Sequence, residues 1–197
     1  MGYFTDLEPD DVIELQPQRK KGEESFGNWE LVFAYCQSEK LKQALQFVDY
    51  IIIHIDTDVC DRVNFDIPKY EAEKELSVEE LRDRVRQKLI GLIGETFYRQ
   101  FAPQFLFAIA IHSLECWLLP LYCTDIKQAA QTKNCEKRLR RVLTGELAKF
   151  SKSQPDYDRL SENYYLNPEK FTQYYPKNPS LKIFIEEIQT RKITLEI

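Results

Sequence analysis

Two stretches of the chain are continuously apolar and rich in β-branched or aromatic residues. The first, VDYIIIHI, begins at Val48 and stops at Asp56, and the second, FLFAIAI, runs from Phe105 to Ile111 and stops at His112. Short runs that are apolar on both faces are typical of interior strands in a parallel sheet that helices cover on both sides. We therefore predict two buried parallel strands.

Helical spacing of apolar residues predicts what lies around these strands. The stretch Asn28–Phe47 has this spacing, and an N-cap at Ser38 is expected to divide it into two helices. The sequence Ser77-Val78-Glu79-Glu80 is a capping box that opens a helix running to about Gln100. Ser113 is expected to cap another helix directly after the second strand. Strand, helix and strand in this order predict a βαβ crossover unit.

The remaining segments complete a fold prediction. Val12–Leu15 resembles a short strand, residues 59–76 show no clear period and are expected to form a long loop, and the chain after Thr124 is mainly helical in pattern. We expect an α/β protein with a mostly parallel, Rossmann-like sheet flanked by helices. Residues 1–125 would form this core, and residues 126–197 a mainly helical C-terminal extension packed on it.

Composition narrows the class of protein without naming a function. The chain has 197 residues, is 43% hydrophobic and carries a formal net charge of -5, which is ordinary for a globular protein. No apolar run is long enough to span a bilayer, and the N-terminal MGYFTDLEPDDVIEL lacks the apolar centre of a signal peptide. These features predict a cytoplasmic protein with no membrane partner.

The five cysteines are expected to be reduced. An odd number without a C-x-x-C pair argues against both a disulfide framework and a structural zinc site. Cys116 and Cys123 fall in apolar, helix-patterned sequence, where a thiol usually behaves as a small hydrophobic group. Only Cys60 lies beside titratable residues that could give it a chemical role.

Acidic residues gather where the first apolar strand ends. Asp56, Asp58 and Asp61 follow this strand, and His112 and Glu115 follow the second. Functional groups of open parallel sheets collect at the carboxyl ends of strands, and an Asp-x-Asp pair there directs both carboxylates to one side. Such oxygens are ligands for Mg²⁺, or for Mn²⁺ in its place. We predict a metal site here, although Asp56 and Asp58 could instead form a turn and cap the next segment.

Glu115 and the two histidines have structural alternatives. An acid in the first turn of a helix is favoured by the helix dipole, which is sufficient to explain Glu115. Its neighbours Leu114, Trp117 and Leu118 nevertheless predict a mostly buried helix, in which a carboxylate needs a partner. His112 and His54 are more simply explained as structural residues than as catalysts.

A basic segment follows in the C-terminal part. Between Lys133 and Lys152 there are seven basic and two acidic residues, which gives a local charge of +5. Lys137, Arg138 and Arg141 share one face of a helix at three- and four-residue spacing. They could contact nucleic-acid phosphates, although a solvated helix face is the simpler interpretation. P-loop, dinucleotide-binding and nucleophile-elbow motifs are absent from the sequence.

Three tracts carry a family resemblance: DYIIIHIDTDVCD, AIAIHSLECWLLPLY and NPSLKIFIEEI, in this order. Together they resemble an uncharacterised bacterial family with a Toprim-like fold, related to RloB-like and overcoming-lysogenization-defect nucleases, over roughly residues 11–190. The resemblance implies that Asp56 and Asp58 are the Toprim metal-binding acids and that Glu115 is the acid of a Glu-x-Trp-Leu-Leu helix. It also implies an ABC-type ATPase as a partner, since such proteins are often encoded together in defence loci.

One departure from the family leaves two functions open. Toprim catalysis uses a glutamate at the end of a first strand, in a Val-Glu-Gly-like motif, and this sequence has no match to it. We expect either that the start has been assigned too far downstream or that this copy is degenerate. The first hypothesis is a Mg²⁺-dependent nuclease with Glu115 in a catalytic role. The alternative is a noncatalytic binding or regulatory subunit.

Overall fold

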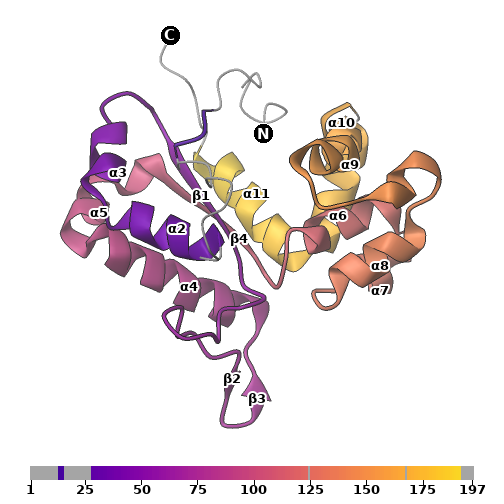
Figure 1. The fold of residues 1–197 in the computed structure, drawn as a ribbon, viewed down its shortest axis with the longest axis horizontal. Coiled ribbons are helices and arrows are strands. Elements are labelled where there is room, and N and C mark those ends of the chain that lie inside the picture. Colours follow the sequence, from indigo (N-terminus) through magenta and orange to yellow (C-terminus); the bar gives the residue numbers. More distant parts are fainter. Residues whose placement is uncertain (1–12, 16–27, 124, 167, 192–197) are drawn as a thin grey trace.

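A computed structural model describes residues 13–15, 28–123, 125–166 and 168–191 (Figure 1). The described chain is a mixed α/β fold, mostly helical, with a small parallel sheet at its centre. The sheet pairs β1 (Ile51–Asp56) with β4 (Phe105–Ala110) in parallel, so that Asp56 lies opposite Ala110. Both predicted apolar strands are therefore confirmed as neighbours in one parallel sheet.

The two strands differ in how deeply they are buried. All six residues of β4 are buried, whereas β1 alternates between buried and open positions. Ile51, Ile53 and Ile55 face the core, but Ile52 is 37% exposed. The prediction that both strands are covered on both faces is thus correct for β4 and wrong for β1. In the described part of the chain, the helix that covers the second face, α11 (Pro179–Arg191), packs on β4.

One face of the sheet is covered by the N-terminal helices. The predicted division at Ser38 is confirmed, although the Ser38 hydroxyl donates back to the carbonyl of Tyr35 at 2.7 Å and does not cap the second helix. The capping box at Ser77 is also confirmed, with both of its hydrogen bonds formed. The helix that it opens is interrupted at Gly94, whose φ of 93° lies in the region that favours glycine. These helices are α2 (Asn28–Cys36), α3 (Glu39–Ala44), α4 (Val78–Ile93) and α5 (Glu95–Phe101).

Helix α11 anchors the C-terminal part to the sheet. Leu181, Phe184, Ile185 and Ile188 pack on the second face of β4 in one cluster. At its end, the Arg191 guanidinium donates to the Phe105 carbonyl at 2.6 Å. The C-terminal helix therefore packs on the predicted core, while the predicted division at residue 125 stays a prediction.

A second group of helices lies beside the sheet and encloses its own apolar cluster (Figure 1). Within it, Cys116 and Cys135 form a disulfide that joins two helices. The prediction of reduced cysteines is wrong for this pair, because the chain folds back and brings together two thiols separated by 19 positions. The helices are α6 (Glu115–Tyr122), α7 (Ile126–Ala129), α8 (Cys135–Val142), α9 (Gln154–Leu166) and α10 (Pro168–Tyr174). The short 3-10 turns of the described chain are η2 (Ala102–Gln104), η3 (Gly145–Lys149) and η4 (Tyr175–Lys177).

Two further predictions need correction. The expected loop 59–76 contains an antiparallel hairpin, β2 (Tyr70–Glu71) and β3 (Lys74–Glu75), whose turn residues Ala72 and Glu73 both have positive φ. Of the predicted strand Val12–Leu15, the described residues 13–15 are not a strand, and Val12 lies outside the described residues. None of the described helices is long and apolar enough to cross a membrane.

Candidate functional site

The carboxyl end of β1 meets the beginning of α6. Asp56 is the last residue of β1, and Glu115 is the first residue of α6, a few residues beyond the end of β4. The parallel register brings the two segments together, because Asp56 pairs with Ala110. The backbone N–H of Leu114 then donates to the Asp56 carboxylate. Two acids that are 59 positions apart thereby share one corner of the fold.

Asp56 lacks a partner for one of its oxygens. Its Oδ1 atom is buried and makes no hydrogen bond among the described residues. The imidazole Nε2 of His54 lies 3.6 Å from this Oδ1 atom, which is too long for a hydrogen bond. Burial, followed by the charges of Glu115 and Asp58, raises the pKa of Asp56 to about 7. Near neutral pH this carboxylate is therefore poised between its protonated and ionised forms.

Glu115 has the opposite environment. It is 1% exposed, and its Oε1 accepts a hydrogen bond from the Tyr157 hydroxyl at 2.8 Å and an ion pair from Lys152 Nζ at 2.9 Å. Burial alone would raise the pKa of Glu115, but the hydrogen bonds, with Ser113 first among the donors, hold it below its usual value. The prediction that Glu115 is buried and needs a partner is confirmed. The group is an ionised, fully paired carboxylate.

Lys152 is the residue that the sequence pattern did not reveal. It bridges Glu115 and Glu136, the latter at 3.3 Å, and so joins α6 to α8. Lys152 and Tyr157 lie 37 and 42 positions from Glu115 in the sequence. The sequence indicated only that a buried acid such as Glu115 needs a partner, and it did not indicate which residue would provide it.

The other predicted metal ligands lie in the turn after β1. Asp58 is exposed, and its charge reaches Asp56. Asp61 pairs with Lys69 at 2.9 Å, and this hydrogen bond lowers the pKa of Asp61. Lys69 Nζ also donates to the backbone carbonyl of Asp58 at 2.5 Å. The Asp61 carboxylate is therefore already paired with Lys69.

The described residues include no group of three or more His, Cys, Asp or Glu side chains placed to hold a metal ion. Cys60, the cysteine nearest to the acids, is fully buried, and burial raises the pKa of its thiol to about 11. It is protonated near neutral pH and lacks thiolate character. Of the predicted site residues, the structure brings together Asp56, Asp58 and Glu115.

The end of β4 has an unusual backbone. His112 has a φ of 64°, and its N–H donates to the Thr57 hydroxyl at 2.7 Å. Thr57 is fully buried between Asp56 and Asp58, so this bond fixes the end of β4 to the acidic turn. A non-glycine residue in this region is strained and is often found at functional sites.

The predicted basic residues occupy α8. Lys137 and Arg141 are exposed, and Arg138 is half-buried and donates to the carbonyl of Lys133 at 3.1 Å. Among the described residues, none of these three side chains makes an ion pair with an acid. This arrangement fits both a solvated helix face and a nucleic-acid contact, and the contact stays a prediction.

The comparisons with known proteins give no match. No protein-family model, no curated protein and no solved structure is similar to this chain.

Proposed function

We propose that this chain is a Mg²⁺- or Mn²⁺-dependent nuclease of the Toprim type, which cleaves phosphodiester bonds. The observation that supports the proposal best is the buried Oδ1 of Asp56, which has no hydrogen-bond partner among the described residues. A buried polar atom without a partner carries a free-energy cost of about 1–3 kcal/mol, and more when charged. A divalent ion would give this oxygen its partner and would relieve the repulsion from Asp58 and Glu115.

The chemistry of the acids fits a magnesium ion better than a softer metal. Asp56 and Asp58 offer carboxylate oxygens, and Mg²⁺ commonly binds through one or two carboxylates while keeping several waters. Two protein ligands are therefore enough, although no larger donor group is present in the described chain. When bound, the ion supplies positive charge that orients a phosphate and stabilises the charge developing on its oxygens.

The other residues hold these acids in place. The Leu114 N–H orients the Asp56 carboxylate, and Lys69 holds the backbone carbonyl of Asp58. Glu115 places a negative charge beside Asp56, and Lys152, which pairs with Glu115, partly offsets the effect of this charge on Asp56. In this proposal Glu115 is a positioning residue for the acid pair.

Helix α8 would supply the nucleic-acid contact. If Arg138 and Arg141 each neutralise one phosphate, Arg138→Ala/Arg141→Ala reduces the slope of log affinity against log salt by about 2, since each phosphate contributes about 0.9. Filter binding of labelled DNA and RNA at several salt concentrations measures this slope. An unchanged slope would exclude α8 from the contact.

The alternative is a noncatalytic subunit that works with an ABC-type ATPase. Two observations favour it: Glu115 is fully paired, and the described residues hold no group of three metal ligands. In this case the acidic turn would act as a binding surface only.

One assay separates the two functions. Labelled DNA and RNA are incubated with the protein and Mg²⁺ or Mn²⁺, and wild type is compared with Asp56→Asn/Asp58→Asn. We expect metal-dependent cleavage that falls at least about 100-fold in the double variant, because the loss of a metal or of its charge stabilisation costs about 3 kcal/mol or more. Asp158→Asn, at an exposed position on α9, is the matched control and should retain activity. Cleavage that persists in the double variant would reject this site, and a complete lack of cleavage by wild type would favour the noncatalytic subunit.

A further inference from the structure

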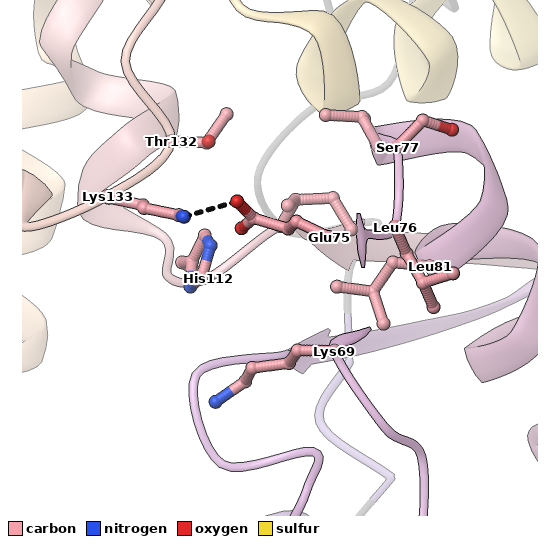
Figure 2. Close-up of a pocket in the computed structure, with 10 residues that line it drawn as sticks. Lys69, Glu75, Leu76, Ser77, Leu81, His112, Thr132 and Lys133 are labelled. Carbon is pink, nitrogen blue, oxygen red and sulfur yellow. Dashed lines mark hydrogen bonds and ion pairs between the residues drawn. The ribbon is translucent and has the colours of Figure 1, made fainter. Parts of the chain in front are cut away.

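A pocket of about 280 Å³ lies between the β2–β3 hairpin, the beginning of α4 and the end of β4 (Figure 2). It is not used by the function proposed above. Its volume is at the small end of the range of about 300–1,000 Å³ that is usual for ligand pockets. The pocket therefore suits one ring system rather than a whole nucleotide.

One wall of the pocket is apolar. Leu76, Val78, Leu81 and Ile111 contribute it, from the hairpin, from α4 and from the end of β4. Figure 2 shows Leu76 and Leu81 on one side of the pocket, opposite His112. A flat ring between these groups would bury both of its faces.

The opposite edge places a hydrogen-bond donor beside an acceptor. Lys133 Nζ lies 2.5 Å from Glu75 Oε2, and both side chains are partly exposed at the mouth of the pocket. Figure 2 shows the His112 ring next to this pair. Burial, followed by the charges of Lys69 and Lys133, lowers the pKa of His112, so the imidazole is neutral near pH 7 and can stack on or hydrogen-bond to a ring.

The pocket is coupled to the acidic turn by two of its own residues. His112 is held in its strained conformation by Thr57, and Lys69 bonds Asp58 and Asp61. Backbone strain is retained where the surroundings fix it, and such positions cluster at ligand sites. A ligand in this pocket would therefore contact the segment that carries the proposed metal site.

From this geometry we propose that the pocket binds a single nucleobase through a donor and an acceptor that are neighbours on its edge. An N–H group of the base donates to the Glu75 carboxylate, and the adjacent ring nitrogen or carbonyl oxygen accepts from Lys133, while the ring lies between His112 and the apolar wall. A carboxylate that accepts from an amino group is an established way to read cytosine. Uracil presents the same pair, since its N3–H donates and its O4 accepts, and guanine does so with its N1–H and O6, so the pocket recognises a base without selecting among the four. As a base-recognition site for a nucleic-acid substrate, the pocket rests on the proposed nuclease function.

The experiment measures binding without any metal. AMP, CMP, UMP and ribose 5-phosphate are titrated in EDTA and followed by ¹⁵N-resolved NMR of the full chain. We expect AMP, CMP and UMP all to bind and to shift the signals of His112 and Lys133. Ribose 5-phosphate should cause no shift at these residues.

Three variants make the test specific. Glu75→Gln should weaken AMP binding at least fivefold, and Thr132→Trp, on the loop at the pocket mouth, should abolish it by filling the space. Lys74→Ala, exposed on the same hairpin and outside the pocket lining, should bind AMP like wild type. Equal binding of ribose 5-phosphate and AMP, or unchanged binding by Glu75→Gln, would overturn the proposal.

The two proposals fail in different ways. AMP binding in EDTA combined with a lack of cleavage would reject the nuclease and keep the pocket. Cleavage that depends on Asp56, combined with a lack of AMP binding, would reject the pocket and keep the nuclease.

Discussion

The two acids at the centre of this fold have opposite environments. Glu115, at the start of α6, is 1% exposed and is paired with Lys152 and Tyr157. Asp56, at the end of β1, is partly exposed, yet its buried Oδ1 atom has no hydrogen-bond partner in the described chain. The pKa of Glu115 is lowered, and the pKa of Asp56 is raised to about 7.

The difference shows that burial alone does not indicate which carboxylate is available for chemistry. The more deeply buried acid is ionised and satisfied, because three donors converge on it. The less buried acid carries the unmet interaction, because its neighbours Asp58 and Glu115 are themselves negative. A ligand with positive charge would therefore change Asp56 far more than Glu115. The predictions below test this contrast, beginning with the largest effect.

The largest effect is expected from the disulfide that fixes the surroundings of Glu115. Cys116 follows Glu115 directly, and Cys135 precedes Glu136, the other partner of Lys152. For a loop of 19 residues, loss of the crosslink costs about 3 kcal/mol in the free energy of unfolding. Thermal unfolding with and without dithiothreitol should show a fall of about 6–12 °C in the melting temperature of wild type on reduction. The variant Cys116→Ser/Cys135→Ser should melt at the same temperature as wild type treated with dithiothreitol. Adding dithiothreitol to this variant should not change its melting temperature. An equal response in both proteins would contradict the crosslink.

A slightly smaller effect is expected from removing the cation of Glu115. Lys152→Met leaves a buried carboxylate without its ion pair, which costs about 2–3 kcal/mol, below the usual cost for a buried pair because Lys152 is half-exposed. Urea unfolding measures this loss. Lys149→Met is the matched control, since Lys149 pairs with Glu146 at the surface, where an ion pair contributes about 0–1 kcal/mol. If both variants lose the same stability, Glu115 does not depend on Lys152.

The smallest effect concerns the titration of Asp56. Its pKa in the folded chain is above the unfolded value of 3.8, so the folded state holds an extra proton between about pH 4 and pH 7. The free energy of unfolding should therefore fall as the pH rises through this window and level off above it. We expect this contribution to be about 1–2 kcal/mol, because partial exposure of the side chain screens it.

Asp56→Asn provides the comparison for this titration. In this variant, the free energy of unfolding should lose only the part of its pH dependence that lies between pH 4 and pH 7. The other carboxylates contribute equally to the pH dependence of both proteins. Urea unfolding at several pH values gives both profiles. Two parallel profiles would show that Asp56 has an ordinary pKa.

Local patterns were sufficient to predict the two central strands and the helices that pack on them, but not every element of this fold. The strands ending near Asp56 and His112, the division at Ser38 and the capping box at Ser77 all depend on residues close together in the sequence. The open face of β1 could not be predicted, because it depends on where α11 packs and not on the apolar run itself. The hairpin 70–75 was missed because two-residue strands have too few positions to show a period.

The candidate site was predictable in part for the same reason. Asp56 and Asp58 could be identified, because the end of a strand is visible in the sequence. The partners Lys152 and Tyr157, and the joining of Cys116 to Cys135, depend on how helices pack and left no local signal. The odd number of cysteines was an argument against disulfides. Five cysteines can equally well form one disulfide and leave three free thiols, as they do here.

The central claim is that Asp56, and not Glu115, has an interaction left for a cation. Titration of the metal-free protein with Mn²⁺ at pH 7.5, followed by the electron paramagnetic resonance signal of free Mn²⁺, tests it most directly. The account predicts one bound ion per chain, which is lost in Asp56→Asn and retained within about threefold affinity in the control Asp158→Asn, since Asp56 alone among the described residues has an unpaired buried side-chain oxygen. Equal Mn²⁺ binding by wild type and Asp56→Asn, or no binding by either, would contradict it.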